Sequence, residues 1–254
     1  DGIYENTLIF YLQDNGACSE ELDWISDREE LNGIQDPMDP MEIQTQMIPL
    51  KTRETIPVKI MKKSMAGSAE SYSAYGPSWA NASNTPFREY KHFVHEGGIA
   101  SPLIVHWPNS IKEKGDFRDE PSHLIDIMAT CIEVSGASYP EKFNGNQIIP
   151  LEGLSLIPVF ENKSLKREAL YWEHDGNRAV RMGKWKLVSK AVKNNWSAWD
   201  KLDILETDQW ELFDMEKDRT ELNNLSKEYP EQVKKMSLMW ESWAKKTGAL
   251  PRPN

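Results

Sequence analysis

The stretch "KHFVHEGGIASPLIVHWP", residues 91–108, combines a polar cluster, a glycine pair and an apolar run. Residues 103–105 are aliphatic and lie between two prolines, which predicts a short buried strand. The pair Gly97-Gly98 permits a sharp reversal of the chain before that strand. The stretch therefore predicts a polar loop that leads into the core of a sheet.

The neighbouring segments supply the other elements of an α/β unit. Residues 6–12 have the length and aliphatic character of another buried strand. A helix is predicted after Ser122, the expected N-cap, because apolar residues recur at helical spacing until Gly136. Strand, loop, strand and helix together indicate an α/β fold.

The segment between the two predicted strands has no sustained hydrophobic period. Residues 19–90 are rich in Pro, Gly, Ser and Asn, and "GPSWANASNTP", residues 76–86, has the composition of a loop. A stretch of this length without predicted elements is typical of a functional loop or an insertion.

The pattern changes after about residue 165. The segments "ALYWEH", "RAVRMGKWKLV" and "QWELFDM" predict short strands, and a final helix is expected from about Pro230 to Gly248. We therefore predict two units. Residues 1–165 form part of an α/β domain with a mixed sheet flanked by helices, and residues 166–254 form a small α+β subdomain with an antiparallel sheet and a C-terminal helix.

Composition excludes several classes of protein. The 254 residues carry a formal net charge of -10, so the chain lacks the basic field that nucleic-acid binding needs. No run approaches the roughly 20 apolar residues that span a bilayer, and the first residues do not resemble a signal peptide. The two cysteines, Cys18 and Cys131, have no C-x-x-C spacing that would indicate zinc. The oligomeric state stays open.

The first predicted strand ends at Asp14-Asn15-Gly16. In open α/β sheets ligands bind beyond the carboxyl ends of strands, and a carboxylate beside an amide offers two hard oxygens suited to Ca²⁺ or Mg²⁺. A calcium ion takes six to eight such oxygens, so other ligands would have to converge on the same place. The same three residues are also typical of a tight turn.

The polar cluster before the glycine pair is the second candidate. Lys91, His92, His95 and Glu96 precede a flexible turn, and cationic and imidazole groups in such a place suit a tetrahedral oxyanion. Polar packing is the alternative interpretation of the histidines.

Five segments taken in order resemble the C-terminal portion of a type I sulfatase of the arylsulfatase family, which has the alkaline-phosphatase-like fold. They are the strand that ends in Asp14-Asn15-Gly16, then "KHFVHEGGIASPLIVHWP", "HLIDIMATCIEVSGASYP", "NRAVRMGKWKLV" and "WELFDMEKDRTELNNLS". The resemblance covers nearly the whole chain.

The resemblance implies roles for three residues. Asp14 and Asn15 match the second pair of calcium ligands, with Mg²⁺ as another possible ion, and Lys91 matches the catalytic lysine that contacts the substrate sulfate. It also implies a sulfated small molecule or sulfated sugar as substrate, and a periplasmic or secreted location. One departure is Ala100, where the family usually has an arginine.

The nucleophile of the family has no counterpart in these residues. Sulfatases attack sulfur with formylglycine, formed from Cys or Ser in a C-x-P-S-R-like motif, and neither Cys18 nor Cys131 lies in such a motif. We therefore expect a C-terminal fragment of a sulfuric ester hydrolase, inactive by itself, with the formylglycine upstream. The alternatives are a phosphatase, phosphodiesterase or phosphonate hydrolase of the same superfold, or a non-catalytic scaffold module.

A further substrate contact is expected from the segment "WEHDGNRAVR" in the small subdomain. It places His174 and Asp175 at a predicted turn, with Arg178 and Arg181 after it. Such a turn could overhang the site, since recognition groups often lie on loops. An exposed polar hairpin is the alternative. His95 is the other candidate for substrate binding.

Overall fold

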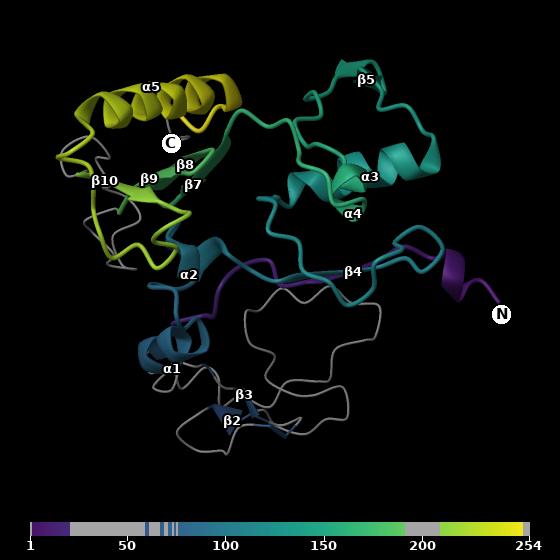
Figure 1. The fold of residues 1–254 in the computed structure, drawn as a ribbon, viewed down its shortest axis with the longest axis horizontal. Coiled ribbons are helices and arrows are strands. Elements are labelled where there is room, and N and C mark those ends of the chain that lie inside the picture. Colours follow the sequence, from purple (N-terminus) through teal and green to yellow (C-terminus); the bar gives the residue numbers. More distant parts are fainter. Residues whose placement is uncertain are drawn as a thin grey trace.

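The computed structural model describes residues 2–20, 59–60, 67–68, 71–72, 74, 76–190 and 209–250. Figure 1 shows the elements, and everything below concerns these residues. Most of the predicted insertion, residues 19–90, lies outside them. Within the described part of the chain, none of the helices has the length and apolar character needed to cross a bilayer.

The C-terminal part forms an antiparallel sheet covered by one long helix. The strands are β7 (Leu170–His174), β8 (Asn177–Met182), β9 (Trp185–Ser189) and β10 (Trp210–Asp214), in the order β10-β9-β8-β7. Helix α5 (Pro230–Thr247) begins with its proline in the first turn and ends at Gly248, whose φ is 79°. The predicted antiparallel sheet and C-terminal helix are therefore confirmed.

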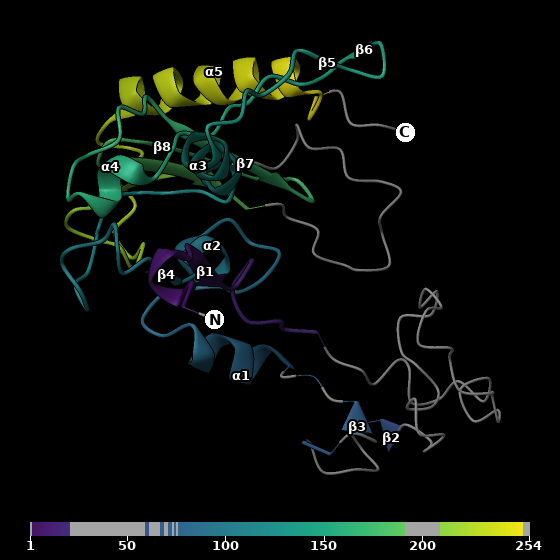
Figure 2. The same cartoon turned by 90° about the vertical axis from the view of Figure 1, so that its right-hand side faces the viewer.

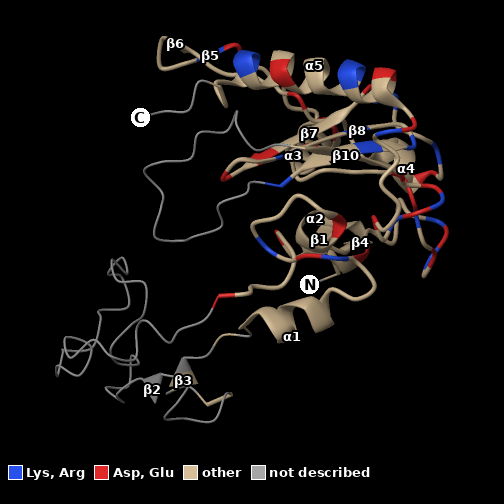
Figure 3. Ribbon diagram, turned by 90° about the vertical axis from the view of Figure 1, so that its left-hand side faces the viewer, with Lys and Arg blue, Asp and Glu red and all other residues tan. Residues whose placement is uncertain are grey.

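The two faces of this sheet bury different partners because strand side chains alternate in direction. One face presents Val180, Leu187 and Leu212 to the inner side of α5. Figure 3 shows that the outer side of that helix carries Lys and Glu. The other face packs Ala179, Val188 and Phe213 against Val94, a residue of the loop that sequence analysis singled out. The sheet thus supports the candidate site.

The N-terminal part contains the first strand pair and the helices beside it. Strand β1 (Ile9–Leu12) pairs with β4 (Leu103–His106) in antiparallel register, so that Phe10 faces Val105. The remaining elements are η1 (Tyr4–Asn6), β2 (Lys59–Ile60), β3 (Ser71–Tyr72), α1 (Gly76–Ser83), α2 (Glu96–Ile99), α3 (Ile125–Ser135), β5 (Lys142–Phe143), β6 (Asn146–Gln147) and α4 (Ile157–Phe160). Figure 2 shows α5, the C-terminal sheet, the layer of α2 with β1 and β4, and α1 stacked in that order.

Three details differ from the sequence prediction. Residues 76–83 form helix α1 and not a loop, since Pro77 occupies its first turn and Ala80 is fully buried. Helix α3 begins at Ile125, because the Ser122 hydroxyl donates to the Glu120 carbonyl and caps nothing. Strand β4 is not fully buried: Ile104 is 61% exposed, because its face of the β1–β4 pair is uncovered among the described residues.

Candidate functional site

The turn after β1 is fixed by close contact with α2. The Gly16 amide donates to the Gly98 carbonyl at 2.9 Å. A Cβ on Gly16 would lie 1.8 Å from the Gly97 carbonyl oxygen, so only glycine permits this approach. Asn84 holds the next residue, since its Oδ1 accepts from the Ala17 amide at 3.1 Å. The segment that carries Asp14 and Asn15 is therefore locked against the glycine pair.

The loop that carries Lys91 joins the same turn. The Lys91 amide donates to the Ala17 carbonyl at 3.1 Å, which places the lysine beside the end of β1. Its ammonium lies 3.6 Å from Glu20 Oε1, and about a third of the side chain is exposed. The structure thus brings together the two segments that sequence analysis singled out as metal-binding and sulfate-binding.

The glycine pair acts through close packing. A Cβ on Gly97 would lie 2.2 Å from the Glu89 carbonyl oxygen, and one on Gly98 would lie 1.9 Å from the Phe93 carbonyl oxygen. Both glycines lie within the short helix α2, and neither has a positive φ. The predicted chain reversal is therefore a helical turn pressed against the preceding loop.

Glu96 connects this turn to the C-terminal sheet through buried charges. Its carboxylate accepts from Lys186 Nζ and from Arg219, both at 2.9 Å, and Lys186 also contacts Glu221 at 2.8 Å. Glu221 in turn accepts from the Glu96 amide at 2.7 Å. Burial by itself would raise the pKa of Glu96, but the charges and hydrogen bonds of Lys186 and Arg219 outweigh it and hold the pKa below its ordinary value.

His95 lies in the interior and faces the same sheet. Its side chain is fully buried, and its Nε2 lies 3.2 Å from Glu211 Oε2. That hydrogen bond lowers the pKa of the Glu211 carboxyl, and the charge of Arg88 adds to the effect. The proposed contact between His95 and substrate stays a prediction.

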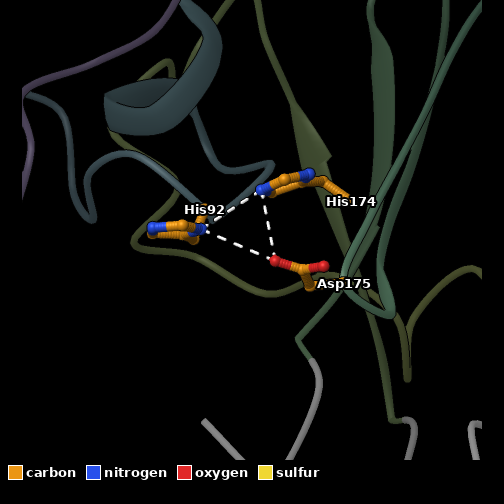
Figure 4. Close-up of side chains that lie close together, drawn as sticks. All are labelled: His92, His174 and Asp175. Carbon is orange, nitrogen blue, oxygen red and sulfur yellow. Dashed lines mark hydrogen bonds and ion pairs between the residues drawn. The ribbon is translucent and has the colours of Figure 1, made fainter. Parts of the chain in front are cut away.

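His174 lies at the surface and meets the Lys91 loop. Its Nε2 is 3.1 Å from His92 Nδ1, and the Asp175 carboxylate lies close to both rings (Figure 4). Burial lowers the pKa of His92, as do the charges of His174 and Lys91. Sequence analysis named His92, His174 and Asp175 but assigned them to separate segments, because nothing in their spacing shows that the hairpin folds onto the loop.

The two arginines of the same hairpin point elsewhere. Arg178 is buried on the α5 side, with its guanidinium 4.5 Å from the centre of the Trp210 ring. Arg181 lies on the opposite face, where burial lowers its pKa and the charge of Glu96 raises it. Strand alternation therefore separates residues that the sequence grouped around one turn.

The donor atoms at the end of β1 suit a hard cation in type. Asp14 is exposed, and its carboxylate has no hydrogen bond or ion pair among the described residues. Asn15 donates its Nδ2 to the Gly16 carbonyl at 2.8 Å, which leaves the amide oxygen as the free ligand atom. These two oxygens fit part of a calcium site, and the rest of the six to eight ligands must come from elsewhere.

Comparisons with known proteins identify the family of the chain. The family model described as "Sulfatase" matches residues 1–137, and the model described as "N-sulphoglucosamine sulphohydrolase, C-terminal" matches residues 88–246. An uncharacterized sulfatase of Schizosaccharomyces pombe is 28% identical over 262 residues, which cover 100% of this chain and 40% of that protein. An N-acetylgalactosamine-6-O-sulfatase of Bacteroides thetaiotaomicron is 26% identical over 157 residues, with coverage of 61% and 29%.

A solved structure shows the same fold. The PsFucS1 sulfatase from Pseudoalteromonas sp. aligns with a TM-score of 0.55 at 16% identity, and the alignment covers 100% of this chain and 40% of that one. The chain thus spans 40% or less of these relatives. Each of the two family models matches more than half of the chain. The chain belongs to the sulfatase family.

Proposed function

We propose that this chain is the C-terminal part of a sulfuric ester hydrolase. One observation carries the proposal: the Lys91 amide donates to the carbonyl of Ala17, which joins the Lys91 loop to the turn that carries Asp14 and Asn15. A metal-binding turn beside a cationic side chain suits an ester of a tetrahedral oxyanion, because metal and cation both stabilise charge on its oxygens.

Asp14 and Asn15 would bind the ion, with Ca²⁺ as the expected metal and Mg²⁺ as the other possibility. Bound there, a divalent ion polarises the ester oxygens. Gly16 holds this turn against helix α2, because its amide donates to the Gly98 carbonyl at 2.9 Å. The remaining ligands and the formylglycine nucleophile are expected upstream of Asp1.

Lys91 would bind the sulfate group. Its ammonium is partly exposed and interacts only weakly with Glu20 at 3.6 Å, so a substrate anion can take the place of that carboxylate. His174, half exposed on the neighbouring hairpin, is the candidate for contact with the rest of the substrate, for which we propose a sulfated sugar. We further propose a periplasmic or secreted location.

The test uses the full-length protein, including the sequence upstream of Asp1. We expect it to hydrolyse an aryl sulfate in a calcium-dependent reaction, and we expect Asp14→Ala to abolish that dependence. The 254-residue chain by itself should show no turnover. Mass spectrometry should detect an aldehyde at the upstream nucleophile.

Two results would contradict the proposal. The first is faster turnover of an aryl phosphate or phosphonate than of the sulfate ester, with an unmodified Ser or Thr upstream. The second is full calcium-dependent activity in the Asp14→Ala variant. Lys190→Ala, which removes a surface lysine paired with Glu89, is the control, and Asp14→Ala would then be as active as this control.

A further inference from the structure

Three side chains from two distant segments converge beside the Lys91 loop. His92 Nδ1 lies 3.1 Å from His174 Nε2, His92 Nδ1 lies 3.6 Å from Asp175 Oδ2, and His174 Nε2 lies 3.3 Å from the same oxygen. Figure 4 shows the two rings and the carboxylate facing one another across the gap between the loop and the β7–β8 hairpin. All three atoms are of the kinds that ligate metals.

These distances match those between the ligands of a tetrahedral metal ion. With bonds of about 2.1 Å, two ligands of a tetrahedral zinc lie about 3.4 Å apart. Each of the three distances is within about 0.3 Å of that value. We propose that His92, His174 and Asp175 form a binding site for a divalent ion of the zinc class, which takes two imidazole nitrogens and a carboxylate oxygen.

The protein already holds both segments in this arrangement. Asn177 is almost completely buried, and its Nδ2 donates to the carbonyls of His92 and His174, each at 3.0 Å. His92 and Asp175 have positive φ values of 85° and 50°, a conformation rare outside glycine. The Gly176 amide donates to Glu173 Oε1 at 3.0 Å, which fixes the turn. Little ordering would therefore accompany metal binding.

The cluster has an open side and an outer carboxylate. The His174 side chain is 52% exposed and that of Asp175 is 34% exposed, so an ion can enter from solvent and keep a water as its fourth ligand. Glu20 Oε1 lies 3.7 Å from His92 Nε2, the ring nitrogen that does not join the cluster. That separation exceeds the length of a hydrogen bond, so Glu20 acts on the imidazole through its charge and not as an orienting partner.

This site is distinct from the one proposed at the end of β1. It uses nitrogen ligands, which suit zinc, whereas Asp14 and Asn15 offer only hard oxygens, which suit calcium. It does not depend on the proposed function. Because His92 follows Lys91 directly, a bound ion would fasten the Lys91 loop to the small subdomain.

The experiment titrates the full chain, purified without a polyhistidine tag, with zinc chloride in a calorimeter. We expect one equivalent to bind. Loss of a residue that only hydrogen-bonds to a metal ligand costs roughly 10- to 100-fold in metal affinity. His174→Ala removes a ligand itself and should therefore weaken zinc binding by at least about 100-fold. Asp175→Asn should also weaken binding, and asparagine tolerates the positive φ at this position.

Two control variants define the site. His106→Asn removes a histidine from β4 and should leave zinc binding unchanged. Asp14→Ala should also leave it unchanged, which separates this proposal from the calcium site. Cobalt in place of zinc should give the intense visible absorption of a tetrahedral complex in wild type and not in His174→Ala. Equal zinc affinity in wild type and His174→Ala, or loss of zinc binding in Asp14→Ala, would overturn the proposal.

Discussion

The charged residues on the two sides of helix α2 differ in burial and in pairing. The inner side faces the C-terminal sheet, and the outer side faces the turn after β1 and the Lys91 loop. On the inner side, Glu96, Lys186 and Glu221 are buried, and each is matched by an opposite charge within 2.9 Å. On the outer side, Asp14 is exposed without a partner among the described residues, and Lys91 reaches Glu20 only at 3.6 Å. Paired buried charges fix the position of a loop, whereas weakly paired exposed charges remain available to a ligand. The buried ion pairs of the inner side therefore hold in place the loop that presents Lys91 on the outer side.

Removing the cation of the inner side should give the largest effect. Lys186→Met leaves Glu96 with only the half-exposed Arg219 and leaves Glu221 Oε1 without a cation. Breaking a buried ion pair from one side typically costs about 3–5 kcal/mol, and we expect a loss of that size in the free energy of unfolding, measured by urea denaturation.

Lys246→Met is the matched control for this measurement. Lys246 pairs with Glu152 at 2.7 Å, and both side chains are exposed, so the midpoint of urea denaturation should stay close to that of wild type. Equal effects of the two substitutions would show that the buried charges do not fix the loop.

Gly16→Ala tests the contact between the two sides directly. The new Cβ would overlap the Gly97 carbonyl, so the turn after β1 must move and lose its hydrogen bond to Gly98. Overpacking of this kind typically costs 1–3 kcal/mol, and we expect about 2 kcal/mol in urea denaturation together with loss of calcium binding in the full-length protein.

Gly145→Ala provides the comparison, since Gly145 has a φ of +82° with nothing within 4 Å of its Cβ position. It should cost about 1 kcal/mol through backbone strain alone and leave calcium binding intact. If Gly16→Ala still bound calcium, the position of this turn would not determine metal binding.

The stability of the protein should depend on pH through Glu96. Glu96 has a lowered pKa in the folded protein, so its contribution is present above the pKa of the unfolded chain, about 4.3, and is lost as pH falls through the folded value. In Lys186→Met the charge and hydrogen bond of Lys186 no longer lower that pKa, while burial still raises it. The stability difference between wild type and Lys186→Met should therefore shrink as pH falls below about 4.3. A difference that stays constant down to pH 3 would contradict this account.

Local patterns predicted much of the fold. Aromatic and β-branched residues between turn residues located β7 to β10, and the positive φ of Gly136 and Gly248 confirms both predicted helix ends. Local patterns failed where distant contacts decide the outcome. Helix α1 forms in a segment of loop composition and buries Ala80, and Ile104 in the aliphatic strand β4 is largely exposed. Sequence gave no sign that Asn84 would hold Ala17, since this contact joins residues 67 positions apart.

The candidate site was predictable only in part. The order of Asp14-Asn15, Lys91 and Glu96-Gly97-Gly98 revealed the family, because each feature lies in one short segment. The convergence of His92 with His174 was not predictable, because it requires the C-terminal sheet to dock on the Lys91 loop through Val94 and Asn177. Sequence periodicity indicates local structure, and it does not indicate which side chains of two distant segments will come into contact.

Lys91→Ala should have the smallest effect on stability and a large effect on function. The side chain is partly exposed and its ion pair with Glu20 is long, so the free energy of unfolding should change by less than about 0.5 kcal/mol. Removal of one group that stabilises developing charge typically lowers kcat by about 100- to 1,000-fold, and we expect a loss of this size in the full-length protein.

Lys190→Ala removes a lysine of similar exposure, which pairs with Glu89 at 2.8 Å. It should leave both stability and turnover near wild type. If Lys91→Ala destabilises the protein as much as Lys186→Met, the Lys91 ammonium also holds its own loop in place. If Lys91→Ala instead changes turnover alone, the two sides of α2 have different roles. The buried ion pairs on the inner side position the Lys91 loop, and Lys91 contacts the substrate.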